Sequence, residues 1–173
     1  MSAQPKSDPL AAAMAQWSAA WGPASASRVG AVRSIMRVQQ ILLARLNERL
    51  GRFGLTYARY EALMLLHHSE EGALSIGKVA DLLRLHRTSA GALIEGLQSS
   101  GLARRTGHPT DRRTSLASIT DRGRDVAVAA TGALHEIAFG TTPLQVEEVD
   151  SIFATLRWIR LNARDFEAVP QPG

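Results

Sequence analysis

Residues 75–119 carry three apolar patterns in a fixed order, and this order constrains the fold more than any other feature of the chain. Residues 75–83 and 86–100 each place apolar side chains at helical spacing, and the connection between them is short. From 102 to 106 and from 115 to 119 the helical period disappears, and the two runs flank a polar turn at 107–111. We therefore expect two short helices joined by a tight turn and followed by a β-hairpin.

The remaining sequence is helical in character. Asp8 and Pro9 form a typical helix start, Gly54 ends a long amphipathic pattern, and Thr56 and Thr120 are candidate N-caps. Thr142 and Gln145 have the spacing of a capping box. We predict further helices over residues 9–21, 27–53, 56–72, 121–139 and 145–166.

These elements divide the chain into segments within a single domain. We expect N-terminal helices over 9–53, a central lobe over 55–120 and C-terminal helices over 121–166, with disordered ends at 1–8 and 167–173. The fold class is mainly α with a small β-hairpin.

Positive charge is concentrated in the central lobe. The net charge of the whole chain is +4, but residues 84–124 alone contain eight arginines against three acidic residues. A local positive field attracts a polyanion, so double-stranded DNA is favoured as a partner over a membrane or an acidic protein.

Several functional classes have no support. The chain contains no cysteine, which excludes disulfides and thiolate metal sites. His67 and His68 are adjacent on a helix and are expected to point apart, so we predict no metal site. We find no catalytic motif, cofactor motif, secretion signal or membrane span, and we expect a cytoplasmic protein of the bacterial nucleoid that is not an enzyme.

The second short helix and the hairpin supply the candidate DNA-binding residues. A helix fits the major groove of B-DNA, and side chains at its start reach base edges or phosphates. Arginines at the tip of a hairpin suit a narrow minor groove, and arginines at its base add charge toward the DNA backbone. The residues expected to contact DNA are Ser75, His86, Arg87, Thr88, Ser89, Arg104, Asp111, Arg112, Arg113 and Thr114.

The sequence resembles the MarR family of bacterial regulators. The resemblance covers about residues 28–165 and is carried by Ala80-Asp81-Leu82-Leu83, by Leu93-Ile94-Glu95-Gly96-Leu97, and by Asp111-Arg112-Arg113 leading to Ser118-Ile119-Thr120. It implies a winged helix-turn-helix in an intertwined triangular homodimer. Arg113 would then enter the minor groove, held by Asp111, and the half-sites would lie about 34 Å apart.

The resemblance also implies a small-molecule effector. The N-terminal helix with its tryptophans resembles a subgroup that responds to urate and phenolic compounds, in which Trp17, Glu61 and Arg105 match residues that frame the ligand. Leu93 stands where a further arginine is expected, which favours a different aromatic acid. The candidate ligand residues are Trp17, Trp21, Tyr57, Tyr60, Glu61 and Arg105.

Other interpretations remain open from the sequence alone. The tryptophans and tyrosines could instead pack in a dimer interface or a core, and Glu61 could be a surface carboxylate. Gly91 and Ala92 stand where many members of the family carry polar or basic residues. The alternatives to a ligand-responsive repressor are therefore an architectural DNA-binding protein without an effector and a dimerisation module without DNA binding.

Overall fold

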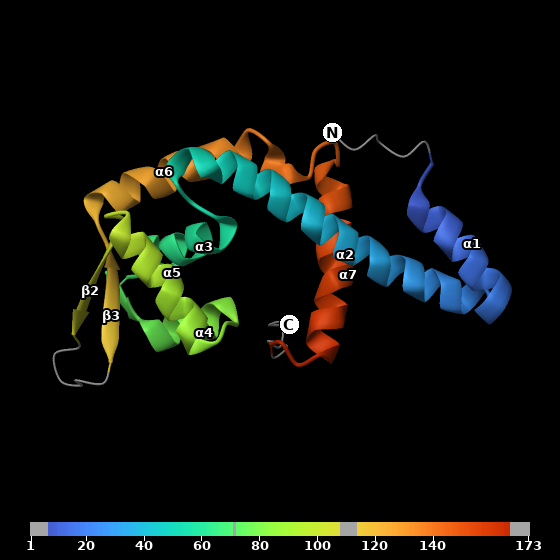
Figure 1. Cartoon of the computed structure of the whole chain (residues 1–173), viewed down its shortest axis with the longest axis horizontal. Helices are drawn as coiled ribbons and strands as arrows, with labels where there is room; N and C mark the ends of the chain where they lie inside the picture. Colours follow the sequence, from blue (N-terminus) through green and yellow to red (C-terminus); the bar gives the residue numbers. More distant parts are fainter. Residues whose placement is uncertain (1–6, 71, 108–113, 167–173) are drawn as a thin grey trace, which may run out of the picture.

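The computed structural model describes residues 7–70, 72–107 and 114–166. In Figure 1, the helices α2 (Pro23–Leu50) and α6 (Asp121–His135) lie along one side of the molecule, and the shorter helices lie beneath their meeting point. The hairpin of β2 (Ala103–Gly107) and β3 (Ser115–Ile119) extends from one end. At the opposite end α1 (Pro9–Trp21) folds back on α2, and α7 (Val146–Asn162) crosses α2 between α1 and the shorter helices.

The first two helices form an antiparallel pair. Asp8 caps α1 by accepting a hydrogen bond from the Leu10 amide at 2.9 Å, as the sequence predicted. The predicted start of the long helix at residue 27 is wrong, because α2 begins at Pro23 directly after Gly22, which has a φ of 85°. Proline suits the first turn of a helix because its missing N–H needs no partner there. A 3₁₀ turn, η1 (Gly51–Phe53), follows α2 and ends at Gly54.

The central lobe contains three helices and three strands. Thr56 caps α3 (Tyr57–His67), which ends earlier than the predicted 70–72 boundary. Ser75 caps α4 (Ile76–Leu83), and α5 (Arg87–Ser99) follows after a short turn. Both predicted hairpin strands are confirmed. A third strand, β1 (Ala73–Ser75), is not predicted by the sequence pattern; it pairs with β3, so the antiparallel sheet has the order β1-β3-β2.

The C-terminal helices differ in detail from the prediction. Thr120 caps α6 through the Gly123 amide, but α6 ends at His135 rather than 139 because Ala138 and Phe139 take positive φ values in the following 3₁₀ turn, η2 (Ala138–Gly140). The capping box of α7 is formed by Gln145 and Glu148, not by Thr142 and Gln145. Helix α7 ends at Asn162, before the predicted 166.

The hydrophobic core lies inside the central lobe and the helix ends that cover it. The largest fully buried side chains come from α2, α3, α4, α5, the residue before β2 and α6, and they are Leu50, Leu63, Leu66, Val79, Ile94, Leu97, Leu102 and Leu134. Arg45 of α2 donates to the Gly140 carbonyl at 2.9 Å, and Arg49 pairs with Glu136 at 3.5 Å. These two polar contacts join α2 to the segment that follows α6, and the lobe itself is fixed to α2 and α6 by packing and by the contacts Tyr57 N to Asn47 Oδ1 and Tyr60 to Thr131.

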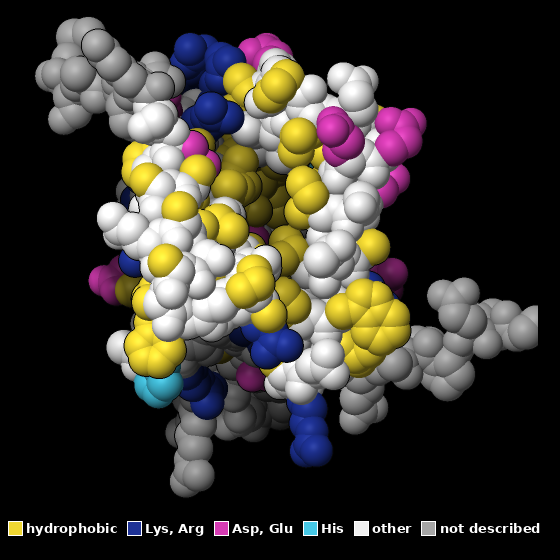
Figure 2. All heavy atoms as spheres, turned by 90° about the vertical axis from the view of Figure 1, so that its right-hand side faces the viewer, with side chains coloured by type: hydrophobic (Ala, Val, Ile, Leu, Met, Phe, Trp, Pro, Cys, Tyr) yellow, Lys and Arg dark blue, Asp and Glu magenta, His cyan; other side chains and the backbone are white. Residues whose placement is uncertain are grey.

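Helices α1 and α7 contribute no buried residue in the single chain. Trp21, Phe153 and Trp158 are 69%, 62% and 65% exposed, and Met36 of α2 is also exposed. Figure 2 shows hydrophobic side chains around a hollow on this end of the molecule. An exposed apolar surface of this kind is typical of a protein–protein interface.

None of the helices in the described part of the chain combines the length and the apolar character needed to cross a bilayer.

Candidate nucleic-acid interface

Helices α4 and α5 form a helix-turn-helix with a defined buried side. Ser75 accepts a hydrogen bond from the Lys78 amide at 3.1 Å and so begins α4. Arg84 ends α4 in the left-handed region, with a φ of 54°. The buried residues of the two helices are Ile76, Val79, Ala80, Ala90, Ile94 and Leu97. Since this stripe packs inward, the opposite face of α5 remains available to a ligand.

The start of α5 presents polar side chains outward. Arg87, Thr88 and Ser89 are all exposed. Gly91 is half-buried and Ala92 is exposed, so neither offers a hydrogen-bonding side chain beyond the first turn. The cationic side chain of this helix, Arg87, and the hydroxyls of Thr88 and Ser89 lie at its N-terminal end, which is the part of a recognition helix that reaches base edges.

Arg87 lies close to the N-terminus of α4. A Cβ placed on Gly77 would lie 3.8 Å from Ser75 Oγ and 3.9 Å from both Cζ and Nη2 of Arg87. Ser75 and Lys78 also line a surface cavity of about 570 Å³ that extends to Thr114. Ser75 and Arg87 lie close together at a helix N-terminus, where a guanidinium and backbone amides favour a phosphate, while Lys78 lines the cavity together with the acidic Glu70.

Sequence reasoning missed Lys78. Its only signal was that it is the single basic residue on α4 and follows the Ser75 cap by three positions.

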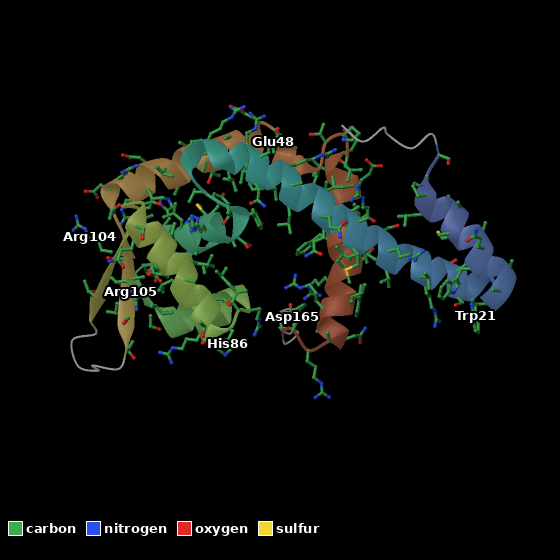
Figure 3. The ribbon with its side chains drawn as sticks, in the orientation of Figure 1. Trp21, Glu48, His86, Arg104, Arg105 and Asp165 are labelled. Atoms are coloured by element: carbon green, nitrogen blue, oxygen red, sulfur yellow. The ribbon has the colours of Figure 1, made fainter. Side chains whose placement is uncertain are left out.

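His86 is the N-cap of α5 rather than a freely oriented side chain. Its Nδ1 accepts a hydrogen bond from the Thr88 amide at 3.3 Å and lies 3.1 Å from Thr88 Oγ1. The Nδ1 atom is therefore occupied, and Nε2 is the nitrogen that remains to contact DNA. Figure 3 places His86 at the start of α5, well away from the base of the hairpin.

The hairpin places two further arginines on β2. Arg104 and Arg105 are exposed, and Arg105 Nη2 donates to Ser115 Oγ on β3 at 3.4 Å. Both arginines line a surface cavity of about 640 Å³ together with Arg122 of α6. Figure 3 shows Arg104 near the base of the hairpin. Asp111, Arg112 and Arg113 lie outside the described residues, and Thr114 is half-buried at the cavity shared with Ser75.

The candidate effector residues are not gathered in one place within a single chain. Tyr57, Tyr60 and Glu61 lie together on α3, and the two tyrosine rings are 6.2 Å apart. Trp17 and Trp21 pack against each other on α1 at 6.4 Å, and Trp17 Nε1 donates to Ser25 Oγ at 3.0 Å. Figure 3 shows Trp21 and Arg105 at opposite ends of the molecule.

Glu61 and Tyr57 share a partly dehydrated environment. Burial raises the pKa of Glu61, and a hydrogen bond from the Tyr57 side chain partly offsets this change. The pKa of Tyr57 is raised by burial first and then by the nearby Glu61 carboxylate. Tyr60 is buried, and its hydroxyl lies 2.9 Å from Thr131 Oγ1 on α6.

An apolar groove runs between α2, α3 and α7. It has a volume of about 450 Å³ and is lined by Ser34, Ile35, Val38, Gln39, Leu42, Leu43, Leu46, Tyr57, Ile152 and Leu156. Tyr57 is the one candidate effector residue among them. A groove of this size and composition suits an apolar or aromatic group with few charges.

The described residues contain no group of three or more His, Asp or Glu side chains that could hold a metal ion. The expectation that His67 and His68 point apart is wrong, because their rings meet edge-on with centroids 5.1 Å apart.

The three-stranded sheet, the paired helices α4 and α5 and the basic groups beside them define a winged helix-turn-helix DNA-binding protein. The crystal structure of Sco5413, a MarR family transcriptional regulator from Streptomyces coelicolor, is 42% identical to the chain and superposes with a TM-score of 0.76. The match covers 82% of this chain and 99% of that protein. The chain belongs to the MarR family of DNA-binding transcriptional regulators.

Further comparisons agree with this assignment. The MarR family model matches residues 53–114. The HTH-type transcriptional regulator MhqR of Bacillus subtilis is 27% identical over 125 residues, which is 70% of this chain and 83% of MhqR. CouR from Rhodococcus jostii RHA1, solved with p-coumaroyl-CoA bound, is 25% identical with a TM-score of 0.64, and the match covers 78% of this chain and 92% of CouR. These relatives are regulators, so the expectation of a non-enzymatic protein is confirmed.

Proposed function

We propose that the chain is a transcriptional repressor that binds a pseudo-palindromic operator as a homodimer and is released by a small aromatic or phenolic effector. The observation that carries the DNA-binding mode is the exposed start of α5, where Arg87 lies beside the Ser75-capped N-terminus of α4. Arg87 donates to guanine acceptors or to phosphate, while Thr88 and Ser89 contact phosphate oxygens or a thymine methyl group.

His86 takes part through Nε2, since Nδ1 already caps α5. Ser75 and Lys78 bind the phosphate that precedes the base contacts, because both lie at the N-terminus of α4.

The hairpin supplies the second DNA contact. Arg112 and Arg113 join the paired strands β2 and β3 and enter the adjacent minor groove, with Asp111 orienting Arg113. Arg104 and Thr114 add contacts to the DNA backbone. The support is the register of the two strands, which pair from Ala103–Ile119 to Gly107–Ser115. The structure does not describe residues 108–113 themselves.

The homodimer forms through the helices outside the central lobe. Their exposed apolar side chains on α1, α2 and α7 need a partner surface, and a second copy presents the same surface. The two lobes then meet successive half-sites about 34 Å apart on one face of the DNA. In the cell the dimer acts on the bacterial nucleoid in the cytoplasm.

The effector binds in the groove between α2, α3 and α7. The groove is almost wholly apolar, and Tyr57 offers a hydroxyl at its edge beside the half-buried Glu61. The phenolic acyl group in the CouR structure supports this ligand class by analogy. Tyr60 stabilises the position of Tyr57 through ring contact. Trp17, Trp21 and Arg105 do not line this groove in one chain, and they contribute to it only from the partner subunit.

Two measurements test this proposal. An electrophoretic shift with the promoter region of the protein's own gene should show a discrete complex at low salt, and failure to bind it or any fragment carrying an inverted repeat would contradict the DNA-binding mode. Thermal unfolding with a panel of phenolic acids should show stabilisation, and the same compound should release DNA. If the protein binds DNA and no compound changes that binding, the alternative of an architectural DNA-binding protein without an effector would hold instead.

A further inference from the structure

A side-chain contact that has no part in the proposed DNA binding joins the helix-turn-helix to the segment after the C-terminal helix. Arg84, the left-handed residue that ends α4, donates from Nη2 to the backbone carbonyl of Asp165 just beyond α7. Its Nε also lies 3.7 Å from Asp165 Oδ1. One guanidinium thus contacts the same residue twice, across 81 positions of sequence.

The Asp165 side of this contact is fixed by residues of α7. Arg160 Nε donates to Asp165 Oδ2 at 2.8 Å, which leaves Oδ1 facing Arg84. Arg157 and Arg160 also stack over the Phe166 ring, with their Cζ atoms 5.1 and 5.3 Å from its centroid. The contacts of Arg157 and Arg160 with Asp165 and Phe166 therefore fix the turn after α7 independently of Arg84.

Little else ties α7 to the lobe. No residue of α7 is buried, and among the described residues the Arg84–Asp165 contact is the one side-chain hydrogen bond or ion pair that joins residues 55–119 to residues 141–166. Figure 3 shows Asp165 in the space between α7 and the lobe. The orientation of the lobe relative to α7 therefore depends on this contact more than on packing.

We propose that Arg84 and Asp165 are positioning residues that fix the winged lobe against α7. The consequence for DNA rests on the proposed function: if α7 lies in the dimer interface, the contact sets the separation of the two recognition helices. Loss of the contact then widens the range of separations that the lobes sample. Binding to the best-spaced operator falls, while binding to operators with altered spacing falls less or rises.

The chain offers a matched set of variants. Arg84→Asn removes the guanidinium and suits the left-handed backbone, because asparagine tolerates positive φ. Arg164→Asn is the control, since Arg164 has nearly the same φ (55°), is exposed and has no side-chain partner among the described residues. Asp165→Asn weakens the ion pair but keeps the backbone carbonyl. It also removes a negative charge, so a purely electrostatic effect on DNA would strengthen binding rather than alter the spacing preference.

The decisive measurement needs no DNA. Because the sequence contains no cysteine, Gln98→Cys on α5 and Thr155→Cys on α7 give two specific spin-label sites, both exposed. The labelled protein is mixed with a large excess of unlabelled protein, so that most distances arise within one chain. We expect one narrow distance distribution in the parent and in Arg164→Asn. We expect a broader distance distribution in Arg84→Asn and in Asp165→Asn. The double variant that combines Arg84→Asn with Asp165→Asn should show no further broadening.

An unchanged distribution in both Arg84→Asn and Asp165→Asn would overturn the proposal, whether or not the protein binds DNA. Broadening in Arg164→Asn equal to that in Arg84→Asn would overturn it as well, because the effect would then belong to any charge change near this turn. If the distributions broaden as expected and no operator is bound, the proposed function fails while the positioning role stands.

Discussion

His86 and Thr88 are joined at the start of α5, where the imidazole Nδ1 accepts the Thr88 amide hydrogen at 3.3 Å. A side chain expected to contact DNA is thereby also the N-cap of the helix that presents Arg87. His86→Ala removes the acceptor and should lower the free energy of unfolding by about 1 kcal/mol, whereas His86→Asn keeps an acceptor and should lose only a few tenths. Thermal unfolding of both variants checks this. An equal loss in the two would mean that the cap contributes nothing.

Gly123, in the first turn of α6, packs directly against the backbone before β2. A Cβ at this position would lie 2.1 Å from the Leu102 carbonyl oxygen and 2.8 Å from Ile119 Cγ1. Because a backbone carbonyl has little room to move, Gly123→Ala should destabilise the protein by about 1–3 kcal/mol. Urea unfolding measures the change.

Gly132 provides the matched control within the same helix. A Cβ there would meet nothing within 4 Å in the single chain. Gly132→Ala should therefore stabilise the protein by about 0.5–1 kcal/mol, through the better helix propensity of alanine. If both alanine variants shifted stability in the same direction, the close approach at Gly123 would not be the cause.

Glu61 makes stability depend on pH. Burial raises the pKa of its carboxyl group in the folded protein. As the pH rises through the range between the unfolded and folded pKa values, the folded state retains a proton that the unfolded chain has released, so the free energy of unfolding falls. This loss begins at the ordinary glutamate pKa and is complete above the folded value.

The comparison of Glu61→Gln with the parent isolates this effect. The variant cannot ionise, so it should gain stability relative to the parent as the pH rises from about 4 to about 8. Urea unfolding at several pH values checks the trend, and Glu95→Gln, at an exposed carboxylate on α5, is the control. A stability difference that is constant over this range, or that changes in the opposite direction, would contradict the assigned environment of Glu61.

Most of the fold could be predicted from local signals in the sequence. Asp8, Thr56, Ser75 and Thr120 all cap helices as predicted, because capping depends on a side chain and the amides two or three residues away. The hairpin strands were also predicted, because alternation and turn residues are local patterns.

The errors arose where tertiary or backbone context decides. Strand β1 is only three residues long, too short to show alternation, and it exists because Leu74 pairs with Ala117 far along the chain. The early end of α6 follows from positive φ values at Ala138 and Phe139, which neither residue type favours on its own.

The candidate site was predictable in composition but not in arrangement. Arg87, Thr88 and Ser89 were identified from their place at a helix start, and the structure exposes all three. The proximity of Arg87 to Ser75 and the contact between Arg84 and Asp165 depend on how distant segments pack, which no local pattern encodes.

The salt dependence of DNA binding in Arg87→Ala tests the central claim most directly. Arg28 is exposed near the start of α2, the end of this helix that lies away from the central lobe in Figure 1, and it provides the control variant Arg28→Ala. With an operator fragment in fluorescence anisotropy, Arg87→Ala should weaken binding by about 1–3 kcal/mol if the arginine reads a base, or reduce the salt slope by about one if it binds phosphate. Arg28→Ala should change neither. Unchanged affinity and slope in Arg87→Ala would show that the start of α5 does not contact DNA.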